Sequence, residues 1–134
     1  MSVVVVIRDP PVRAVVIDDT IDIRELLALV LTRSGMQVVG QAGDGKAGID
    51  IVRAERPDVV LLDLAMPVMD GVEALPIIRE LVPDARIIVL SAFAGAVSEQ
   101  VLDWGADGYL LKGTPLKKIV EYVEATLAGD TDAT

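Results

Sequence analysis

The most informative run in the chain is Val59-Val60-Leu61-Leu62-Asp63-Leu64-Ala65-Met66-Pro67-Val68-Met69-Asp70-Gly71. Its first four residues are apolar, which is typical of a strand that helices cover on both faces. The strand delivers one carboxylate, Asp63, to its C-terminal end, where a loop marked by proline and glycine begins at once. In an open α/β sheet, ligands bind beyond this end of the strands. The run therefore predicts a parallel sheet with Asp63 at its ligand-binding edge.

Short β-branched runs alternate with amphipathic stretches on both sides of this strand. Strands are expected at 13–17, 37–41, 58–62, 86–90 and 107–111, and helices at 20–34, 45–55, 71–82, 95–104 and 115–128. Strict alternation of strand and helix predicts an α/β fold with a doubly wound, five-stranded parallel sheet. The expected strand order is 2-1-3-4-5, the flavodoxin-like (βα)5 arrangement, in which strands one and three are neighbours.

The first and last helices have clear apolar stripes and recognisable ends. The stripes, which we expect to face the sheet, are Ile23, Leu26, Leu27 and Val30 in the first helix and Leu116, Ile119, Val120, Val123 and Leu127 in the last. Gly35 is expected to end the first helix. For the last helix, Thr114 is the expected N-cap and Pro115 the expected first helical residue.

The composition limits which functions are possible. The chain has 134 residues and a net charge of -9, so it is long enough for one core, and its charge argues against direct nucleic-acid binding by this domain. The simplest reason for so many acidic residues is solubility. The chain contains no Cys and no His, which excludes disulfides, thiolate metal sites and a histidine general base. Any bound metal must therefore be held by oxygen ligands, which favours Mg²⁺.

The two ends of the chain differ from its middle. We expect an N-terminal arm at 1–12, one domain at 13–128 and a C-terminal tail at 129–134. The arm contains the apolar run 3–7, which is too short to cross a bilayer, because a spanning helix needs about 20 apolar residues. The arm also lacks the cationic region of a signal peptide. The sequence therefore predicts a cytoplasmic protein without membrane contact.

Polar side chains follow four of the expected strands. Asp18 and Asp19 follow the first strand, Asp63 the third, Ser91 the fourth and Lys112 the fifth. The strand order brings the three carboxylates into one crevice. Two charges about 4 Å apart repel by about 4 kcal/mol at an effective dielectric near 20, and bound Mg²⁺ would relieve this repulsion. Each residue alone has a simpler reading, as a turn residue or solvated surface, but together they predict phosphoryl transfer to a carboxylate nucleophile.

These motifs resemble the receiver domain of two-component response regulators over about 13–128. The matching segments, in order, are Val15–Asp19, Leu61–Gly71, Leu90–Ala92 and Gly108–Lys112. The resemblance implies that Asp63 accepts a phosphoryl group from the phosphohistidine of a sensor histidine kinase or phosphotransfer protein. It implies that Lys112 pairs with Asp63 or its phosphate and that Ser91 donates a hydrogen bond to the phosphate. The implied Mg²⁺ ligands are Asp19, Asp63 and the backbone carbonyl of Ala65, with Asp18 acting through a bound water.

The resemblance also implies a conformational switch. A phosphoryl group adds charge and three acceptor oxygens, which should draw Ser91 inward. Tyr109 stands where the family has its switch aromatic, and it is expected to rotate into the vacated space. The surface of the fourth helix, fifth strand and fifth helix would then change shape, and a homodimer could form through it. Segments 39–45 and 112–115 resemble the subgroup usually joined to a LuxR-type helix-turn-helix domain.

Some positions depart from the family pattern. Ala65 is often a longer polar residue, and Phe93 is bulky for a position near the phosphate, so we expect an altered phosphate lifetime in either direction. Gly113 stands where many receivers have Pro, which weakens the expectation of a cis peptide after Lys112. Trp104 ends the fourth expected helix, either as a partly buried core residue or as an anchor for a partner that Tyr122 could join.

Two other functions are open at this point. One is a receiver-like scaffold that works without phosphorylation, which the complete set of site residues disfavours. The other is a Mg²⁺-dependent aspartyl phosphohydrolase of the haloacid dehalogenase type. That class needs an Asp-x-Asp frame on the first strand and a cap domain, whereas Asp18-Asp19-Thr20 is a doublet and the chain has no room for a cap. The main prediction is a signalling domain rather than an enzyme.

Overall fold

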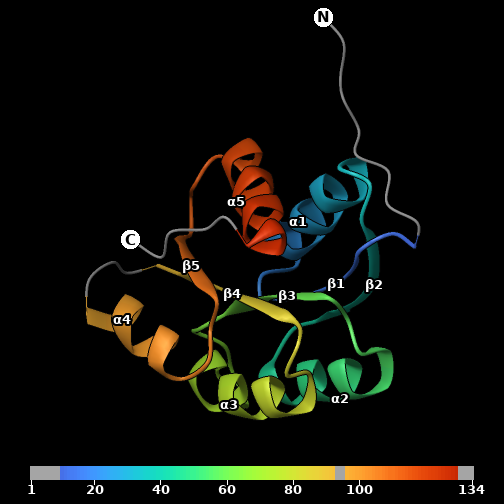
Figure 1. Ribbon diagram of the computed structural model, residues 1–134. Helices are drawn as coiled ribbons and strands as arrows, with labels where there is room; N and C mark the ends of the chain where they lie inside the picture. The colour runs from blue at the N-terminus through green and yellow to red at the C-terminus, as the bar shows by residue number, and fades with distance from the viewer. Residues whose placement is uncertain (1–9, 93–95, 130–134) are drawn as a thin grey trace, which may run out of the picture.

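Five parallel strands form one sheet in the order β2-β1-β3-β4-β5 (Figure 1). The structure, a computed structural model, describes residues 10–92 and 96–129. The strands are β1 (Arg13–Ile17), β2 (Gln37–Ala42), β3 (Val59–Asp63), β4 (Arg86–Ser91) and β5 (Gly108–Leu111). The helices are α1 (Ile21–Arg33), α2 (Gly45–Glu55), α3 (Gly71–Leu81), α4 (Ala96–Asp103) and α5 (Leu116–Ala128). The expected fold class and strand order are confirmed.

Element boundaries differ from the expected ones by one residue at several ends. The most useful difference is that β3 runs to Asp63 and β4 runs to Ser91, so both side chains belong to the ends of strands rather than to loops. The apolar run 3–7 and all of the expected tail except Gly129 lie outside the described residues. Within the part of the chain that the structure describes, no helix is both long and apolar enough to span a bilayer.

The sheet separates two apolar layers. Successive side chains of a strand point to opposite faces, and in β3 they divide between the layers: Val60 and Leu62 on one side, Val59 and Leu61 on the other. Helices α1 and α5 cover the Val59 side, and α2, α3 and α4 cover the Val60 side (Figure 1). All five residues of β3 are buried, which confirms the expected central strand.

The buried face of α1 differs from the expected stripe. Leu27, Ala28 and Leu31 are buried, whereas Ile23 and Leu26 are exposed. The expectation that Ile23 and Leu26 face the sheet was therefore wrong. The helix is rotated so that its sheet-facing row runs through positions 24, 27, 28 and 31, and the two exposed residues border α5 instead. Gly35 follows the helix with a φ of 101°, as expected for a residue that ends it.

The start of α5 also differs from the expectation. Pro115 is the N-cap rather than the first helical residue, and the helix begins at Leu116. Thr114 does not cap the helix, because its hydroxyl donates to the carbonyl of Leu111 at 2.6 Å and so closes the preceding turn. The apolar stripe itself is placed as expected around buried Ile119 and Val123.

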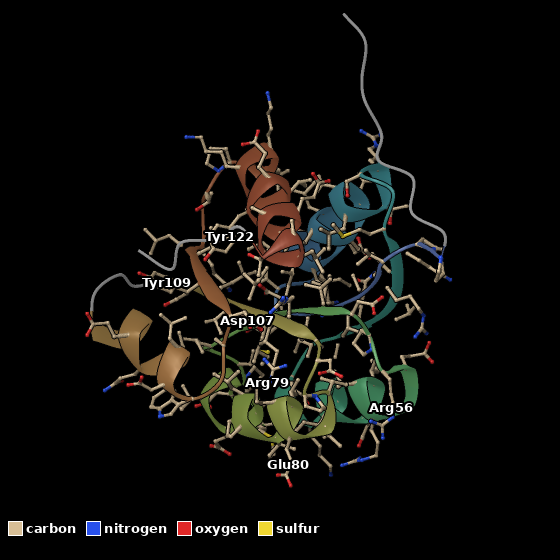
Figure 2. The ribbon with its side chains drawn as sticks, viewed as in Figure 1. Arg56, Arg79, Glu80, Asp107, Tyr109 and Tyr122 are labelled. Atoms are coloured by element: carbon tan, nitrogen blue, oxygen red, sulfur yellow. The ribbon has the colours of Figure 1, made fainter. Side chains whose placement is uncertain are left out.

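Tyr122 joins α5 to β5 at their crossing point. Its ring lies against Gly108, where an added Cβ would stand 2.3 Å from the Tyr122 hydroxyl. That hydroxyl accepts the backbone N–H of Tyr109 at 3.3 Å (Figure 2). Burial raises the pKa of Tyr122, against the smaller opposing effect of this hydrogen bond. The Tyr122 ring and hydroxyl therefore contact β5 and do not form an exposed anchor with Trp104. Trp104 itself follows α4 and is 38% exposed.

Arg79 joins the end of α3 to the loop between α4 and β5. Its guanidinium donates to the carbonyls of Gly105 (2.9 Å) and Val82 (2.9 Å) and to one carboxylate oxygen of Asp107 (3.0 Å) (Figure 2). It also donates to the carbonyls of Pro83 and Ala85. A single half-buried side chain thus fixes the C-terminal end of α4 against the body of the domain.

Candidate functional site

Three carboxylates meet at the C-terminal edge of the sheet, as expected. Asp18 and Asp19 follow β1, Asp63 ends β3, and one oxygen from each lies within 4.8 Å of the others. Asp18 and Asp63 are almost completely buried, at 0% and 1% exposure, whereas Asp19 is exposed. The cluster therefore has a buried floor and one side open to solvent.

Local turns orient the two buried carboxylates. One oxygen of Asp18 accepts the backbone N–H of Thr20 at 2.9 Å, and one oxygen of Asp63 accepts the N–H of Ala65 at 3.2 Å. Both are the short side-chain to backbone bonds that Asp forms in turns. In each residue the other oxygen, Oδ2, faces the ammonium of Lys112.

Lys112 lies between the two buried acids. Its Nζ is 2.8 Å from Asp63 Oδ2 and 3.3 Å from Asp18 Oδ2. The backbone places it there, because the N–H of Lys112 donates to the carbonyl of Ser91 at 2.8 Å and so aligns the ends of β4 and β5. The expected convergence of the acids, Ser91 and Lys112 at one sheet edge is what the structure contains.

The charges at this edge are incompletely balanced. Burial raises the pKa of Asp63; the hydrogen bond from Lys112 lowers it by less, and the charge of Asp18 raises it further. For Lys112, burial disfavours the ammonium, but the hydrogen bond to Asp63 and the charges of Asp18 and Asp63 outweigh it and raise its pKa. The Lys112 ammonium therefore compensates the charges of both Asp18 and Asp63. The ionised form of Asp63 is disfavoured in the folded protein.

Replacing Asp63 by asparagine is expected to stabilise the metal-free protein. The folded state holds the Asp63 proton more tightly than the unfolded chain, so this group favours folding below its ordinary pKa of 3.8. That contribution is lost as the pH rises through the raised pKa of the folded state. At pH 7 the expected gain of Asp63→Asn is about 1–3 kcal/mol, part of the ~4 kcal/mol repulsion of two close charges.

Urea unfolding in EDTA at several pH values measures this gain. The gain should shrink as the pH falls towards 4, because wild-type Asp63 then takes up its proton. Asp50→Asn is the matched control, since Asp50 is exposed and pairs with Arg53 on the same helix, and its effect should stay within about 0.5 kcal/mol. A loss of stability in Asp63→Asn at pH 7 would show that Lys112 already neutralises the site.

The loop after Asp63 brings the backbone close to the site. An added Cβ on Gly71 would lie 2.2 Å from the carbonyl oxygen of Asp63, so only glycine fits there. Within the loop the N–H of Met69 donates to the carbonyl of Pro67 at 2.7 Å around Val68, which has a φ of 67°. This γ-turn is a strained conformation for a β-branched residue, and Val68 is 80% exposed.

The residues present fit a hard divalent cation. Three carboxylate oxygens lie within the span of one ion's coordination sphere, and hard cations such as Mg²⁺ prefer oxygen ligands. Asp18 Oδ2 is fully buried and makes no hydrogen bond within the described residues; its nearby cation, Lys112 at 3.3 Å, is shared with Asp63 at 2.8 Å, so a further positive charge would be favourable here. The exposed side of the cluster at Asp19 leaves room for water or phosphate oxygens as further ligands.

Four further residues were predicted to belong to the site or to its switch, and the structure describes three of them. Ser91 is buried at the end of β4. Tyr109 is half-buried in β5 and packs against the core layer that contains Val60. Ala65 contributes its N–H to Asp63, and the metal-binding role of its carbonyl stays a prediction. Phe93 lies outside the described residues.

Arg24 is a site neighbour that the sequence reasoning did not identify. It donates to the carbonyl of Asp18 at 2.8 Å. No sequence signal pointed to it, because the row that Arg24 shares with Ala28 and Leu31 is identified as the buried row of α1 only by the structure.

An apolar pocket between α1 and α5 was also missed. It has a volume of about 200 Å³, and Lys112 forms part of its wall. Its other lining residues are Ile23, Leu26, Leu27, Leu90, Gly113, Thr114, Leu116 and Ile119. The exposure of Ile23 and Leu26 opens the pocket to solvent beside the acidic cluster.

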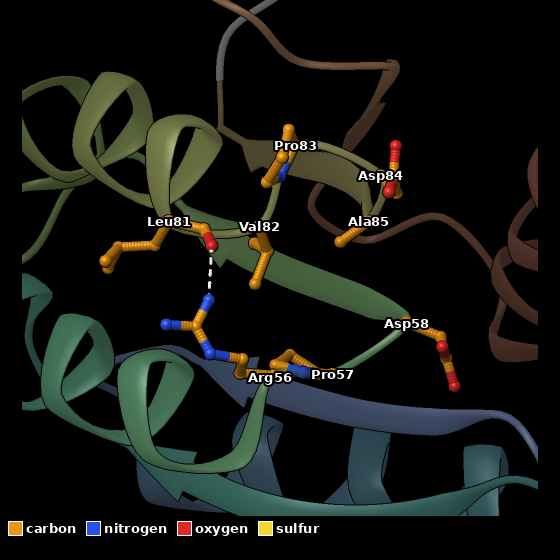
Figure 3. A pocket seen from close by; sticks show the side chains of 8 residues that line it. All are labelled: Arg56, Pro57, Asp58, Leu81, Val82, Pro83, Asp84 and Ala85. Carbon is orange, nitrogen blue, oxygen red and sulfur yellow. Dashed lines mark hydrogen bonds between the residues drawn. The ribbon is translucent and has the colours of Figure 1, made fainter.

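A different pocket lies at the opposite edge of the sheet. It has a volume of about 270 Å³ and is formed by the segments before β3 and β4, residues 56–58 and 81–85 (Figure 3). Arg56 spans it and donates to the carbonyl of Leu81 at 2.8 Å. Because these segments precede β3 and β4, whose other ends carry Asp63 and Ser91, this pocket is separate from the candidate site.

A family model matches most of the chain. Residues 14–124 match the model described as "Response regulator receiver domain". The probable transcriptional regulatory protein NarL of Mycobacterium tuberculosis is 40% identical over 114 residues, which cover 84% of this chain and 53% of that protein. The chain thus spans about half the length of this curated relative.

Solved structures give the same result. The signal receiver domain of M. tuberculosis NarL matches with a TM-score of 0.82 and 37% identity, over 89% of this chain and 98% of that one. A LuxR-family response regulator from Aurantimonas sp. matches with a TM-score of 0.81 and 33% identity, over 89% and 86%. In the CheX–CheY–BeF3–Mg complex from Borrelia burgdorferi, the values are 0.82 and 27%, over 86% and 88%. The expected resemblance to receivers of LuxR-type regulators is confirmed.

Proposed function

Because the chain belongs to the family of response regulator receiver domains, we propose that it accepts a phosphoryl group on Asp63 from a phosphohistidine protein. The single observation that carries this proposal is the ion pair between Lys112 and a nearly buried Asp63 inside a cluster of three acids. The similar CheY of Borrelia burgdorferi, whose structure is a complex with CheX, BeF3 and Mg, supports the same chemistry here. The domain then acts in signalling by changing its surface, rather than by turning over a substrate.

The proposed step is a direct displacement at phosphorus. A carboxylate oxygen of Asp63 attacks the phosphorus of the phosphohistidine, an O–P bond forms, and the P–N bond breaks. The electron pair of that bond returns to the imidazole nitrogen of the donor. Lys112 stays within reach of the new phosphoryl oxygens, and Ser91 at the neighbouring strand end donates a hydrogen bond to one of them. The product is an aspartyl phosphate.

A divalent cation fits this step electrostatically. We propose Mg²⁺ held by Asp19, Asp63 and the carbonyl of Ala65, with Asp18 acting through water. When bound, it supplies positive charge that shields the phosphoryl oxygens from the acids. The carboxylates of the chain hold and orient the cation, and the buried position of Asp63 limits access of bulk water to the product.

We place the switch at the junction of β4, β5 and α5. Phosphorylation would draw Ser91 towards the new acceptors, and Tyr109 would turn into the space beneath β5. The contact of Tyr122 with the backbone of Tyr109 supports a coupled movement of β5 and α5. The fixed point of α4 is its C-terminal end, where Arg79 donates to the carbonyl of Gly105.

The apolar pocket between α1 and α5 is the docking surface that we propose for the phosphodonor protein. Lys112 lines this pocket and also contacts Asp63, so a partner seated there brings its phosphohistidine close to the acceptor. Ile23 and Leu26 supply exposed apolar surface of the kind that anchors protein contacts. The occupant that we propose is a phosphohistidine domain that presents an apolar side chain to the pocket.

Replacing Leu26 by glutamate tests both the function and the docking surface. Radiolabel transfer from a purified phosphohistidine protein in Mg²⁺ should be about tenfold slower or worse, because the loss of one central apolar contact has that size. Phosphorylation by acetyl phosphate should be unchanged, since a small donor needs no docking surface.

Leu29→Glu is the matched control for this experiment. Leu29 lies on the same helix with 46% exposure against 44% for Leu26, but it does not line the pocket. It should transfer at the wild-type rate from both donors. Equal rates for Leu26→Glu and wild type with the protein donor would contradict the docking surface, and no transfer to wild type would contradict the function.

Several finer expectations stay predictions. They are a homodimer through α4, β5 and α5, a cytoplasmic location, an altered phosphate lifetime and the domain limits at residues 13 and 128. A C-terminal DNA-binding domain is a proposal for the whole protein, since the matched residues make up 53% of the transcriptional regulatory protein NarL. The scaffold and phosphohydrolase alternatives have no structural observation in their favour.

A further inference from the structure

Arg24 is a half-buried cation that has no anionic partner within the described residues. It lies on the sheet-facing row of α1 and makes no ion pair among residues 10–92 and 96–129. Its Nε is buried without a hydrogen bond in this part of the chain. Removing a guanidinium from water costs free energy unless hydrogen bonds or an opposite charge compensate it. Nη1 of Arg24 donates to the carbonyl oxygen of Asp18 at 2.8 Å.

That contact fixes the peptide between the two acids of β1. The carbonyl of Asp18 and the N–H of Asp19 belong to one planar unit, so a fixed oxygen direction also fixes how the chain enters Asp19. Two further hydrogen bonds position Asp18. Its backbone N–H donates to the carbonyl of Ala42 at 3.0 Å, and its Oδ1 accepts the backbone N–H of Thr20 at 2.9 Å. Arg24 supplies the remaining restraint on the turn that presents both carboxylates.

The neighbouring loop leaves space for this side chain. A Cβ added to Gly43 would stand 3.1 Å from Nη1 of Arg24, closer than most real contacts of a Cβ atom. Gly43 has no positive φ that would itself require glycine. A side chain at position 43 would therefore press on the guanidinium and require it to shift by a few tenths of an ångström.

We propose that Arg24 is a positioning residue for the cation site, which orders the Asp18–Asp19 turn so that both carboxylates face Asp63. This inference rests on the proposed function. Positioning and charge predict opposite results, because the positive charge of Arg24 repels a divalent cation while its hydrogen bond prepares the ligands. If positioning dominates, removing Arg24 weakens Mg²⁺ binding; if charge dominates, removing it strengthens Mg²⁺ binding.

The test is titration calorimetry of Mg²⁺ without a phosphodonor, on wild type, Arg24→Met and Arg33→Met. Arg33 lies in the last turn of the same helix, is exposed, and loses the same charge. We expect about tenfold weaker binding for Arg24→Met, the order of one lost charged hydrogen bond. Arg33→Met should stay within about twofold of wild type.

Gly43→Ala gives a second variant that keeps Arg24 and crowds its guanidinium. It should weaken Mg²⁺ binding in the same direction by a smaller factor, and it decides the question if Arg24→Met fails to fold. Unchanged or tighter binding in the folded Arg24→Met, or in Gly43→Ala where that variant decides, overturns the inference and leaves the proposed function intact. Failure of wild type to bind Mg²⁺ contradicts the proposed function instead.

Discussion

Replacing Arg79 by methionine is expected to lower the free energy of unfolding by about 3 kcal/mol, because several hydrogen bonds worth about 1 kcal/mol each are lost together. The bonds lead to four backbone carbonyls and to the carboxylate of Asp107. Asp107 would keep its bond from the N–H of Ile87 at 2.8 Å, with Arg86 at 3.6 Å as its remaining cation. For a domain of this size the melting temperature should fall by roughly 10 °C.

Arg53→Met is the matched control for this change. Arg53 is exposed and pairs with Asp50 three residues earlier on α2, so its removal should cost less than about 0.5 kcal/mol. Urea unfolding of both variants at pH 7 gives the comparison. A loss below about 1 kcal/mol in Arg79→Met would mean that water replaces the five bonds, and α4 would then have no fixed end.

Arg79 also shows a limit of reasoning from sequence. Its acceptors are mostly backbone carbonyls, and the partner side chain, Asp107, lies 28 residues away. No spacing along the chain identifies such a pair, because carbonyl positions depend on how α3, β4 and the loop before β5 pack. From the sequence alone, Arg79 is therefore indistinguishable from an ordinary exposed helix residue, and only the three-dimensional position of the loop containing Gly105 shows its role.

The candidate site was more predictable than its surroundings. The buried run of β3 fixes where Asp63 stands, and the strand order then brings Asp18 to it, since parallel strands end at the same edge. The reach of Lys112 to both acids follows from its place at the end of β5. Each of these steps uses strong apolar patterns and a topology with few alternatives.

Helix rotation was not predictable in the same way. In α1 the apolar residues suit two neighbouring faces, one through Ile23 and Leu26 and one through Leu27 and Leu31. Packing against the sheet selects the second face, and with that face inward Arg24 donates a hydrogen bond to the carbonyl of Asp18 after β1. The choice leaves Leu26 exposed at the proposed docking pocket.

The largest expected functional effect is the complete loss of phosphorylation in Asp63→Asn. Asparagine keeps the shape of the side chain but has no anionic oxygen to attack phosphorus. Asp84→Asn is the control, because Asp84 is exposed at the opposite edge of the sheet and should leave labelling unchanged. The wild-type reaction should also stop in EDTA if the acidic cluster works with Mg²⁺.

Intact-mass spectrometry after incubation with acetyl phosphate and Mg²⁺ tests the central claim most directly. Wild type and Asp84→Asn should each gain the mass of one phosphoryl group, and the added group should be lost in mild base, as expected of an acyl phosphate. Asp63→Asn should gain none. Equal labelling of Asp63→Asn, or no labelling of wild type, would contradict the assignment of Asp63 as the phosphoacceptor.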